Sequence, residues 1–370
     1  MSVHAPDYVQ AIAPYQAGKP IAELAREFGL DEASIVKLAS NENPLGMSPG
    51  ARAAMAAAID DLARYPDSNG FELKAAIAAR YRVKAAQITL GNGSNDLLEL
   101  ATRALVPAGG HVVYSDHAFV VYMLASQAVG AVATSVPARD FGHDLDAMLA
   151  AVTPQTRMVF VANPNNPTGT FVPGDVLERF VMALPADVAV VLDQAYDEYL
   201  TPEQRYDATA WLARRDNLII CRTFSKAYGL AGLRLGIALS SPAVTDLMNR
   251  VRQPFNTNSL AQAAALGALA DERFLRESFE MNLAERDRLQ QAFGERGLSY
   301  VPSAANFVLV RVGDGAAITA ALLREGVIIR PVGGYGLPEW VRVSVGLPAE
   351  NTRFLAALDK VRGSAGSTTS

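Results

Sequence analysis

A lysine in the segment 223–236 (TFSKAYGLAGLRLG) has the surroundings of a nucleophilic amine. Lys226 follows the apolar run 217–222 (NLIICR) and is flanked by small and apolar residues. Burial at the end of a strand would lower the pKa of its amine, because desolvation disfavours the ammonium form. A deprotonated amine is the nucleophile that forms a Schiff base with an aldehyde. A solvated surface lysine is the alternative, so this segment alone leaves two roles open.

Groups suited to binding a phosphate occur in two segments. The residues GNGSND at 91–96 precede a helical pattern, and the glycines would let the backbone approach a ligand closely. The amides of Ser94 and Asn95 would then lie at a helix N-terminus, which favours a bound phosphate. An ordinary helix cap explains this segment equally well. The segment around the lysine adds hydroxyls and a cation of the kind that bind phosphate, namely Thr223, Ser225 and Arg234.

Two further polar segments follow strand-like runs. Asp193 closes the apolar run 187–193 (DVAVVLD), and Tyr196 lies three residues on. The Pro-punctuated loop 163–169 (NPNNPTG) follows another such run and includes Asn166. In α/β folds the carboxyl ends of the strands bind ligands, so both segments are candidates for a site. For Asp193 taken alone, a helix or turn cap is the alternative.

The elements that would position these residues alternate along the chain. Short apolar runs rich in Val and Ile, with little polar alternation, are typical of strands buried on both faces of a parallel sheet; they lie at 111–114, 157–162, 187–193 and 217–222. Helical patterns lie between them, at 94–105, 121–129 and 176–184. The alternation predicts the α/β class, with a mostly parallel sheet between two layers of helices.

The two ends of the chain have a different pattern. An amphipathic segment at 21–28 lies within an irregular arm. Long helical patterns at 260–269 and 274–293 are followed by mixed strands and helices at 306–312, 316–325, 327–330, 340–345 and 351–361. This mixture predicts a smaller α+β domain. Residues 363–370 (GSAGSTTS) bury little apolar surface, so we expect a disordered tail.

Composition excludes several classes of protein. The 370 residues include 33 Lys and Arg, 38 Asp and Glu and one cysteine, for a net charge of −5. That balance argues against a nucleic-acid binder, and one cysteine excludes a disulfide framework and fits a reducing cytoplasm. No apolar run approaches a membrane span, and the N-terminus has no signal-peptide pattern. The histidines lack ligand spacing, so we expect no metal site; they are His4, His111, His117 and His143.

Taken together and in this order, the motifs resemble the fold-type I aminotransferases that depend on pyridoxal 5′-phosphate, class II subgroup, and among them the histidinol-phosphate aminotransferase family. The motifs are LASNENPLG (38–46), RYPD (64–67), GNGSND (91–96), HAFVVY (117–122), NPNNPTG (163–169), DQAY (193–196), TFSKAYGLAGLRLG (223–236) and WVRVSVG (340–346). The resemblance runs from about residue 20 to 361. It implies a large cofactor-binding domain at 45–270, and a small domain at 271–362 that the arm at 1–44 joins.

The resemblance assigns roles around the cofactor. Lys226 would form the Schiff base with pyridoxal phosphate and then act as general base and acid. Asp193 would pair with the pyridinium nitrogen, which keeps the ring an electron sink, and Tyr196 and Asn166 would bind the 3′-oxygen. Phe119 would stack on the ring; the family usually has Tyr at this position, and Phe keeps the stacking but lacks the hydroxyl. The cofactor phosphate would bind Ser94, Asn95, Thr223, Ser225 and Arg234, together with Tyr65 of a neighbouring subunit.

The same resemblance implies a substrate and an assembly. Arg342, with Arg330 as its partner, would bind the anionic group of the substrate, together with Asn166 and Tyr15. The reaction would be transamination of histidinol phosphate with 2-oxoglutarate, giving imidazole-acetol phosphate and glutamate in histidine biosynthesis. Because Tyr65 would enter the neighbouring site, the resemblance also implies a homodimer with shared sites.

Three alternatives remain open at this level. An aromatic amino-acid aminotransferase would use the same arginine and an aromatic pocket, although two cations favour a phosphate-bearing substrate. Related lyases that decarboxylate phosphorylated amino acids share these motifs. A non-enzymatic ligand-sensing module would need a basic DNA-binding segment, and the first forty residues contain few basic residues.

Overall fold

A seven-stranded sheet organises the middle of the chain in the computed structural model, which describes residues 4–14 and 18–366. The strand order is β2-β8-β7-β6-β5-β3-β4, and β8 is the antiparallel member, pairing with β2 on one side and β7 on the other. The strands are β2 (Ile88–Gly91), β3 (His111–Ser115), β4 (Val132–Val136), β5 (Thr156–Ala162), β6 (Ala189–Asp193), β7 (Leu218–Thr223) and β8 (Gly236–Ser240).

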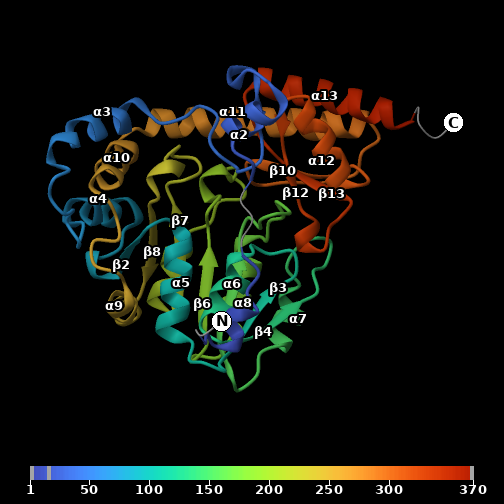
Figure 1. Cartoon of the computed structure of the whole chain (residues 1–370). Coiled ribbons are helices and arrows are strands. Elements are labelled where there is room, and N and C mark those ends of the chain that lie inside the picture. Colours follow the sequence, from blue (N-terminus) through green and yellow to red (C-terminus); the bar gives the residue numbers. More distant parts are fainter. Residues whose placement is uncertain (1–3, 15–17, 367–370) are drawn as a thin grey trace.

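Helices cover both faces of this sheet (Figure 1). One face packs on α4 (Phe71–Tyr81), α7 (Leu145–Ala150), α8 (Gly174–Ala183), α10 (Ser259–Ala270) and the 3₁₀ segment η5 (Ala208–Ala213). The other face packs on α5 (Ser94–Leu105), α6 (Val121–Ala128) and α9 (Pro242–Val251). The α/β class and the three-layer arrangement with a mostly parallel sheet are therefore confirmed.

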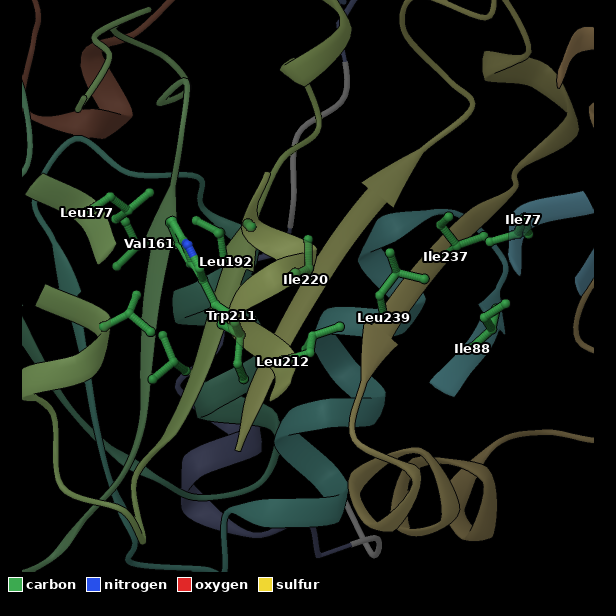
Figure 2. Close-up of a cluster of buried hydrophobic side chains, with 14 of the residues drawn as sticks. Ile77, Ile88, Val161, Leu177, Leu192, Trp211, Leu212, Ile220, Ile237 and Leu239 are labelled. Atoms are coloured by element: carbon green, nitrogen blue, oxygen red, sulfur yellow. The ribbon is translucent and has the colours of Figure 1, made fainter. Parts of the chain in front are cut away.

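Successive residues of the central strands are apolar because each face has its own core. In β6, Val190 and Leu192 join the cluster that also holds Trp211, whereas Val191 joins the cluster on the opposite face. In β7, Ile220 and Cys221 divide in the same way. Figure 2 shows the first cluster, with Leu192, Ile220 and Trp211 among its labelled side chains. Burial on both faces removes the polar alternation of a half-exposed strand.

The two ends of the chain build a second region together. Its antiparallel sheet has the order β12-β13-β10-β9, and a separate parallel pair joins β1 near the N-terminus to β11 near the C-terminus. Its strands are β1 (Val36–Lys37), β9 (Tyr300–Val301), β10 (Phe307–Arg311), β11 (Val327–Ile328), β12 (Arg330–Pro331) and β13 (Trp340–Ser344). Its helices are α2 (Ile21–Phe28), α11 (Glu272–Glu295), α12 (Gly315–Arg324) and α13 (Pro348–Gly366).

Several boundaries differ from the sequence pattern. The single strand expected at 327–330 is two short strands, β11 and β12, that belong to different sheets. Helix α13 continues to Gly366, into the segment where we expected a disordered tail. The remaining elements are α1 (Asp7–Gln10), α3 (Pro49–Ala57), η1 (Glu32–Ser34), η2 (Ile59–Asp61), η3 (Ala85–Gln87), η4 (Asp197–Tyr199), η6 (Ala231–Leu233) and η7 (Gly333–Tyr335). Within the described ranges, no helix is both long and apolar enough to cross a membrane.

Candidate active site

A pocket opens where the large sheet meets the second region. The loops after β5, β6 and β7 supply one wall, and the N-terminus of α5 supplies another. Strands β12 and β13 and the segment 39–41 face them. Parallel strands place the side chains that follow them at a common edge, which is why motifs far apart in the sequence meet here.

Lys226 lies in this pocket, three residues after the end of β7. Its Nζ donates a hydrogen bond to the carbonyl oxygen of Ser40 at 3.0 Å. Burial and the nearby positive charge of Arg342 together lower the pKa of the amine to about 7, against the opposing effect of Glu42. Since a large share of the amine is then uncharged near neutral pH, the side chain is suited to nucleophilic attack on an aldehyde.

Asp193 closes β6 and its carboxylate is buried beside the same pocket. Burial raises its pKa to about 6, and hydrogen bonds from Tyr122 and from the backbone N–H of Ala195 oppose that rise. The Tyr122 hydroxyl lies 2.9 Å from Oδ2, and the Ala195 nitrogen lies 3.1 Å from Oδ1. Both oxygens are thus held by donors, and the carboxylate has a fixed orientation.

Tyr196 follows three residues later and its ring lies 5.9 Å from the Lys226 amine. The side-chain amide of Asn41 donates to the Tyr196 hydroxyl at 2.9 Å. Burial raises the pKa of Tyr196 to about 12, so its phenol stays protonated at neutral pH. Because its oxygen already accepts from Asn41, the Tyr196 hydrogen is available to donate to another group.

The residues expected to bind a phosphate also line the pocket. Helix α5 begins after Gly93, and the first residues of the helix, Ser94 and Asn95, line the pocket. The Arg234 guanidinium donates to the Ser225 hydroxyl at 3.3 Å. A Cβ at Gly93 would collide with that guanidinium, and Gly93 has a φ of +85° that favours glycine. A helix N-terminus, hydroxyls and an arginine therefore line one part of the pocket, and this donor set is suited to binding an anion.

A pair of arginines from the second region also lines the pocket. Arg330 on β12 and Arg342 on β13 are directly opposite each other in the antiparallel pairing, and both line the pocket. Arg342 is buried and donates to the Asn166 side-chain oxygen at 2.6 Å and to the Ala39 carbonyl at 2.7 Å. These contacts fix the guanidinium plane, so the pair is suited to an anionic substrate.

The structure brings most of the expected site residues into this one pocket. Those that line it are Ser94, Asn95, Phe119, Asn166, Asp193, Tyr196, Thr223, Ser225, Lys226, Arg234, Arg330 and Arg342. Tyr65 does not line it: its side chain is 82 % exposed and stacks on Phe255 at 4.6 Å. Tyr15 lies outside the described residues.

Sequence reasoning missed the pocket roles of three side chains. Asn41, Tyr122 and Tyr335 line the pocket but are not among the site residues that the sequence predicts. Asn41 is buried with a φ of +55°, a left-handed conformation that asparagine tolerates. Its backbone N–H donates to the Ser344 hydroxyl, and its carbonyl accepts from Asn306. The sequence signal that could have identified Asn41 is its place as a polar residue in the motif at 38–46 (LASNENPLG).

A buried lysine, a carboxylate at a strand end and a group of donors suited to an anion, all in an α/β sandwich, are what an aminotransferase of class I and II requires. The sequence profile of that family matches residues 33–358, and the chain belongs to it. Histidinol-phosphate aminotransferase 2 of Ralstonia nicotianae is 64 % identical over 96 % of both chains. Histidinol-phosphate aminotransferase 1 of Cupriavidus pinatubonensis is 62 % identical, again over 96 % of both chains. Within the larger family, the chain therefore groups with the histidinol-phosphate aminotransferases.

A solved structure agrees with this placement. The crystal structure of histidinol-phosphate aminotransferase from Sinorhizobium meliloti, in complex with pyridoxal 5′-phosphate, matches with a TM-score of 0.91. It is 33 % identical, and the match covers 99 % of both chains. The resemblance expected from the motifs is thus confirmed over nearly the whole chain.

Proposed function

We propose that this protein transfers the amino group of histidinol phosphate to 2-oxoglutarate with pyridoxal 5′-phosphate as cofactor, a step of histidine biosynthesis. The observation that carries the proposal is one pocket that is lined by Lys226 and by two groups of side chains suited to anions. The donors around Arg234 are one group, and the Arg330–Arg342 pair is the other. Relatives named histidinol-phosphate aminotransferase, at 54 to 64 % identity, support the choice of substrate.

The donor set fits the cofactor. The space beside Gly93 would hold its phosphate, and the absence of a Cβ there keeps the Arg234 guanidinium within reach. Lys226 would hold the aldehyde carbon, Asp193 the ring nitrogen, and Tyr196 with Asn166 the 3′-oxygen. When bound, the protonated pyridine ring supplies an electron sink for the bond that breaks at the substrate Cα.

The side chains of the pocket move the proton, hold the charge of the ring and bind the substrate. Lys226 Nζ takes the proton from the substrate Cα, and a pKa of about 7 suits an amine that must both accept and return a proton. The ionised form of Asp193 keeps the ring nitrogen protonated. Arg342 and Arg330 bind the phosphate of one substrate and a carboxylate of the other, because both anions fit a planar guanidinium.

Single-turnover transamination tests this proposal. The purified protein, loaded with pyridoxal phosphate, is mixed with histidinol phosphate or with phenylalanine, and loss of the cofactor absorbance is followed. We expect histidinol phosphate to react faster. The pocket also has the aromatic side chains Phe119, Tyr196 and Tyr335, so an aromatic amino-acid aminotransferase is the second candidate. If phenylalanine reacted faster by orders of magnitude, the protein would be an aromatic amino-acid aminotransferase and the proposal for histidinol phosphate would be wrong.

We also propose a homodimer in which Tyr65 reaches the cofactor phosphate of the other subunit. Tyr65 stacks on the exposed Phe255, and Ile59, Leu62 and Phe71, which lie close to Tyr65 in the sequence, are exposed as well. Several exposed large apolar side chains are unusual for a surface that stays in water. A second copy of the chain would cover this apolar surface and would also bring Tyr65 to the cofactor phosphate of the other subunit.

Complementation between inactive variants tests the shared site. Tyr65→Ala and Lys226→Ala chains carrying different tags are co-expressed, and the mixed dimer is purified by both tags. One of its two sites would combine an intact lysine with an intact tyrosine, so we expect about half of the wild-type activity per dimer. Each variant expressed alone serves as the control and should show far less. Monomers in sedimentation, or mixed dimers as inactive as the parents, would contradict the proposal.

The same proposal includes the division of the chain. Residues 45–270 would form the large cofactor domain, and the arm at 1–44 would join 271–362 in the small one, as the β1–β11 pair supports. A cytoplasmic location is part of the proposal too, and the single buried cysteine, Cys221, supports it.

A further inference from the structure

A buried tyrosine outside the expected set contacts the carboxylate of Asp193. Tyr122 lies in the first turn of α6 and has no exposed surface. Its hydroxyl donates to Asp193 Oδ2 at 2.9 Å. Its ring stacks on Phe160 with centroids 4.9 Å apart and meets the edge of Phe119 at 5.9 Å. One side chain therefore contacts both Asp193 and the aromatic residue that lines the same pocket.

The packing leaves Tyr122 little freedom to turn away from Asp193. The ring lies almost parallel to Phe160, at 11°, and almost perpendicular to Phe119, at 89°. Rotation of such a ring within a close-packed core would open gaps that its neighbours cannot fill. The hydroxyl is thus held where the carboxylate accepts from it.

Few other groups compensate the buried charge of Asp193. The groups that face the carboxylate are the backbone N–H of Ala195 and four side-chain groups, namely the hydroxyl of Tyr122, the thiol of Cys221, the phenol of Tyr196 and the amine of Lys226. Burial raises the pKa of Tyr122 well above its usual range, so its phenol remains a donor at every working pH. A donor to a carboxylate favours the ionised form.

We propose that Tyr122 is a positioning residue that keeps Asp193 ionised and oriented toward the ring nitrogen of the cofactor. The inference rests on the proposed cofactor. Without the hydroxyl, Asp193 stays buried but loses its side-chain donor, and protonation of the carboxyl becomes easier. The ring nitrogen then loses its charged partner over a wider range of acid pH.

Tyr122→Phe tests this inference, because it removes one oxygen and keeps the ring packing. The dissociation constant for pyridoxal phosphate is measured by absorbance titration across pH, beside single-turnover rates. We expect the acid limb of both profiles to move to higher pH by about 1 to 2 units, since a hydrogen bond to a charged group is among the stronger ones. The direction of the shift follows from the pKa of Asp193, which rises when the carboxylate loses a hydrogen-bond donor. As the solution is acidified, Asp193 is then protonated at a higher pH, and binding of pyridoxal phosphate weakens at that higher pH.

Two further variants separate positioning from packing. Tyr206→Phe is the matched control, because its hydroxyl accepts from Asn163 at 3.0 Å and does not reach the pocket; its profile should stay that of the wild type. Replacement of Tyr122 by 3-fluorotyrosine strengthens the donor and should move the limb to lower pH. This replacement also tests the inference should Tyr122→Phe fail to fold.

The outcomes are distinguishable. A folded Tyr122→Phe protein with an unchanged acid limb, or a 3-fluorotyrosine protein whose limb does not move, would overturn the inference. Equal shifts in Tyr122→Phe and Tyr206→Phe would do the same, because they would indicate a loss of packing alone. Failure of the wild type to bind pyridoxal phosphate would instead overturn the proposed function.

Discussion

Lys226→Ala is expected to lower the single-turnover rate with histidinol phosphate by about 10⁴-fold, since general acid–base catalysis contributes up to that factor. The variant loses both the amine that binds the cofactor aldehyde and the base that takes the Cα proton. Its fold should persist, because Lys226 donates only to the Ser40 carbonyl among the hydrogen bonds of the described residues. Reduction of the holoenzyme with borohydride should fix the cofactor to residue 226 in the wild type and nowhere in the variant.

A second buried lysine provides the control for this experiment. Lys74 is 8 % exposed, and burial lowers the pKa of its amine, but it donates to Asn69 outside the pocket. Lys74→Ala should therefore keep both the activity and the borohydride label. A label on Lys74, or on any lysine other than Lys226, would show that the assignment of the nucleophile is wrong.

Arg342→Ala is expected to lower kcat/KM by about 30- to 5,000-fold, because truncating one member of a buried, hydrogen-bonded charge pair costs about 2–5 kcal/mol. The loss should fall on both half-reactions, since each substrate brings an anion to this arginine. The Asn166 side chain and the Ala39 carbonyl also lose their donor in the variant. Steady-state kinetics with each substrate varied in turn measures the effect.

The variant Arg330→Ala tests which of the two candidate substrates the pocket prefers. Arg330→Ala should weaken binding of histidinol phosphate more than that of phenylalanine, because a phosphate dianion draws on a second cation more strongly than a carboxylate does. Arg311→Ala is the control for both arginine variants: Arg311 lies on β10 of the same sheet, pairs with Glu339 at 2.9 Å and is half exposed.

If the kcat/KM of Arg342→Ala were no lower than that of Arg311→Ala, Arg342 would not bind the anionic group of the substrate.

The central strands and their flanking helices could be predicted because their physical cause is local. An uninterrupted run such as 187–193 is apolar since both faces of β6 are buried. Helix α5 spans the pattern expected at 94–105, because glycines precede it and its leucines recur on one face. By contrast, the strands expected from the sequence do not include β2, β4 or β8, and the pattern at 327–330 does not reveal that β11 and β12 join different sheets.

The residue types in the site were also visible in the sequence, whereas their contacts were not. The sequence by itself determined that a lysine follows a buried strand, that Asp193 closes another, and that glycines and an arginine suited to phosphate accompany them. Only the tertiary structure decided which groups face them. Lys226 meets Ser40, Tyr196 meets Asn41, and Asp193 meets Tyr122. Hydrogen-bond partners so far apart in the chain depend on how sheets and helices pack, and no local pattern records that packing.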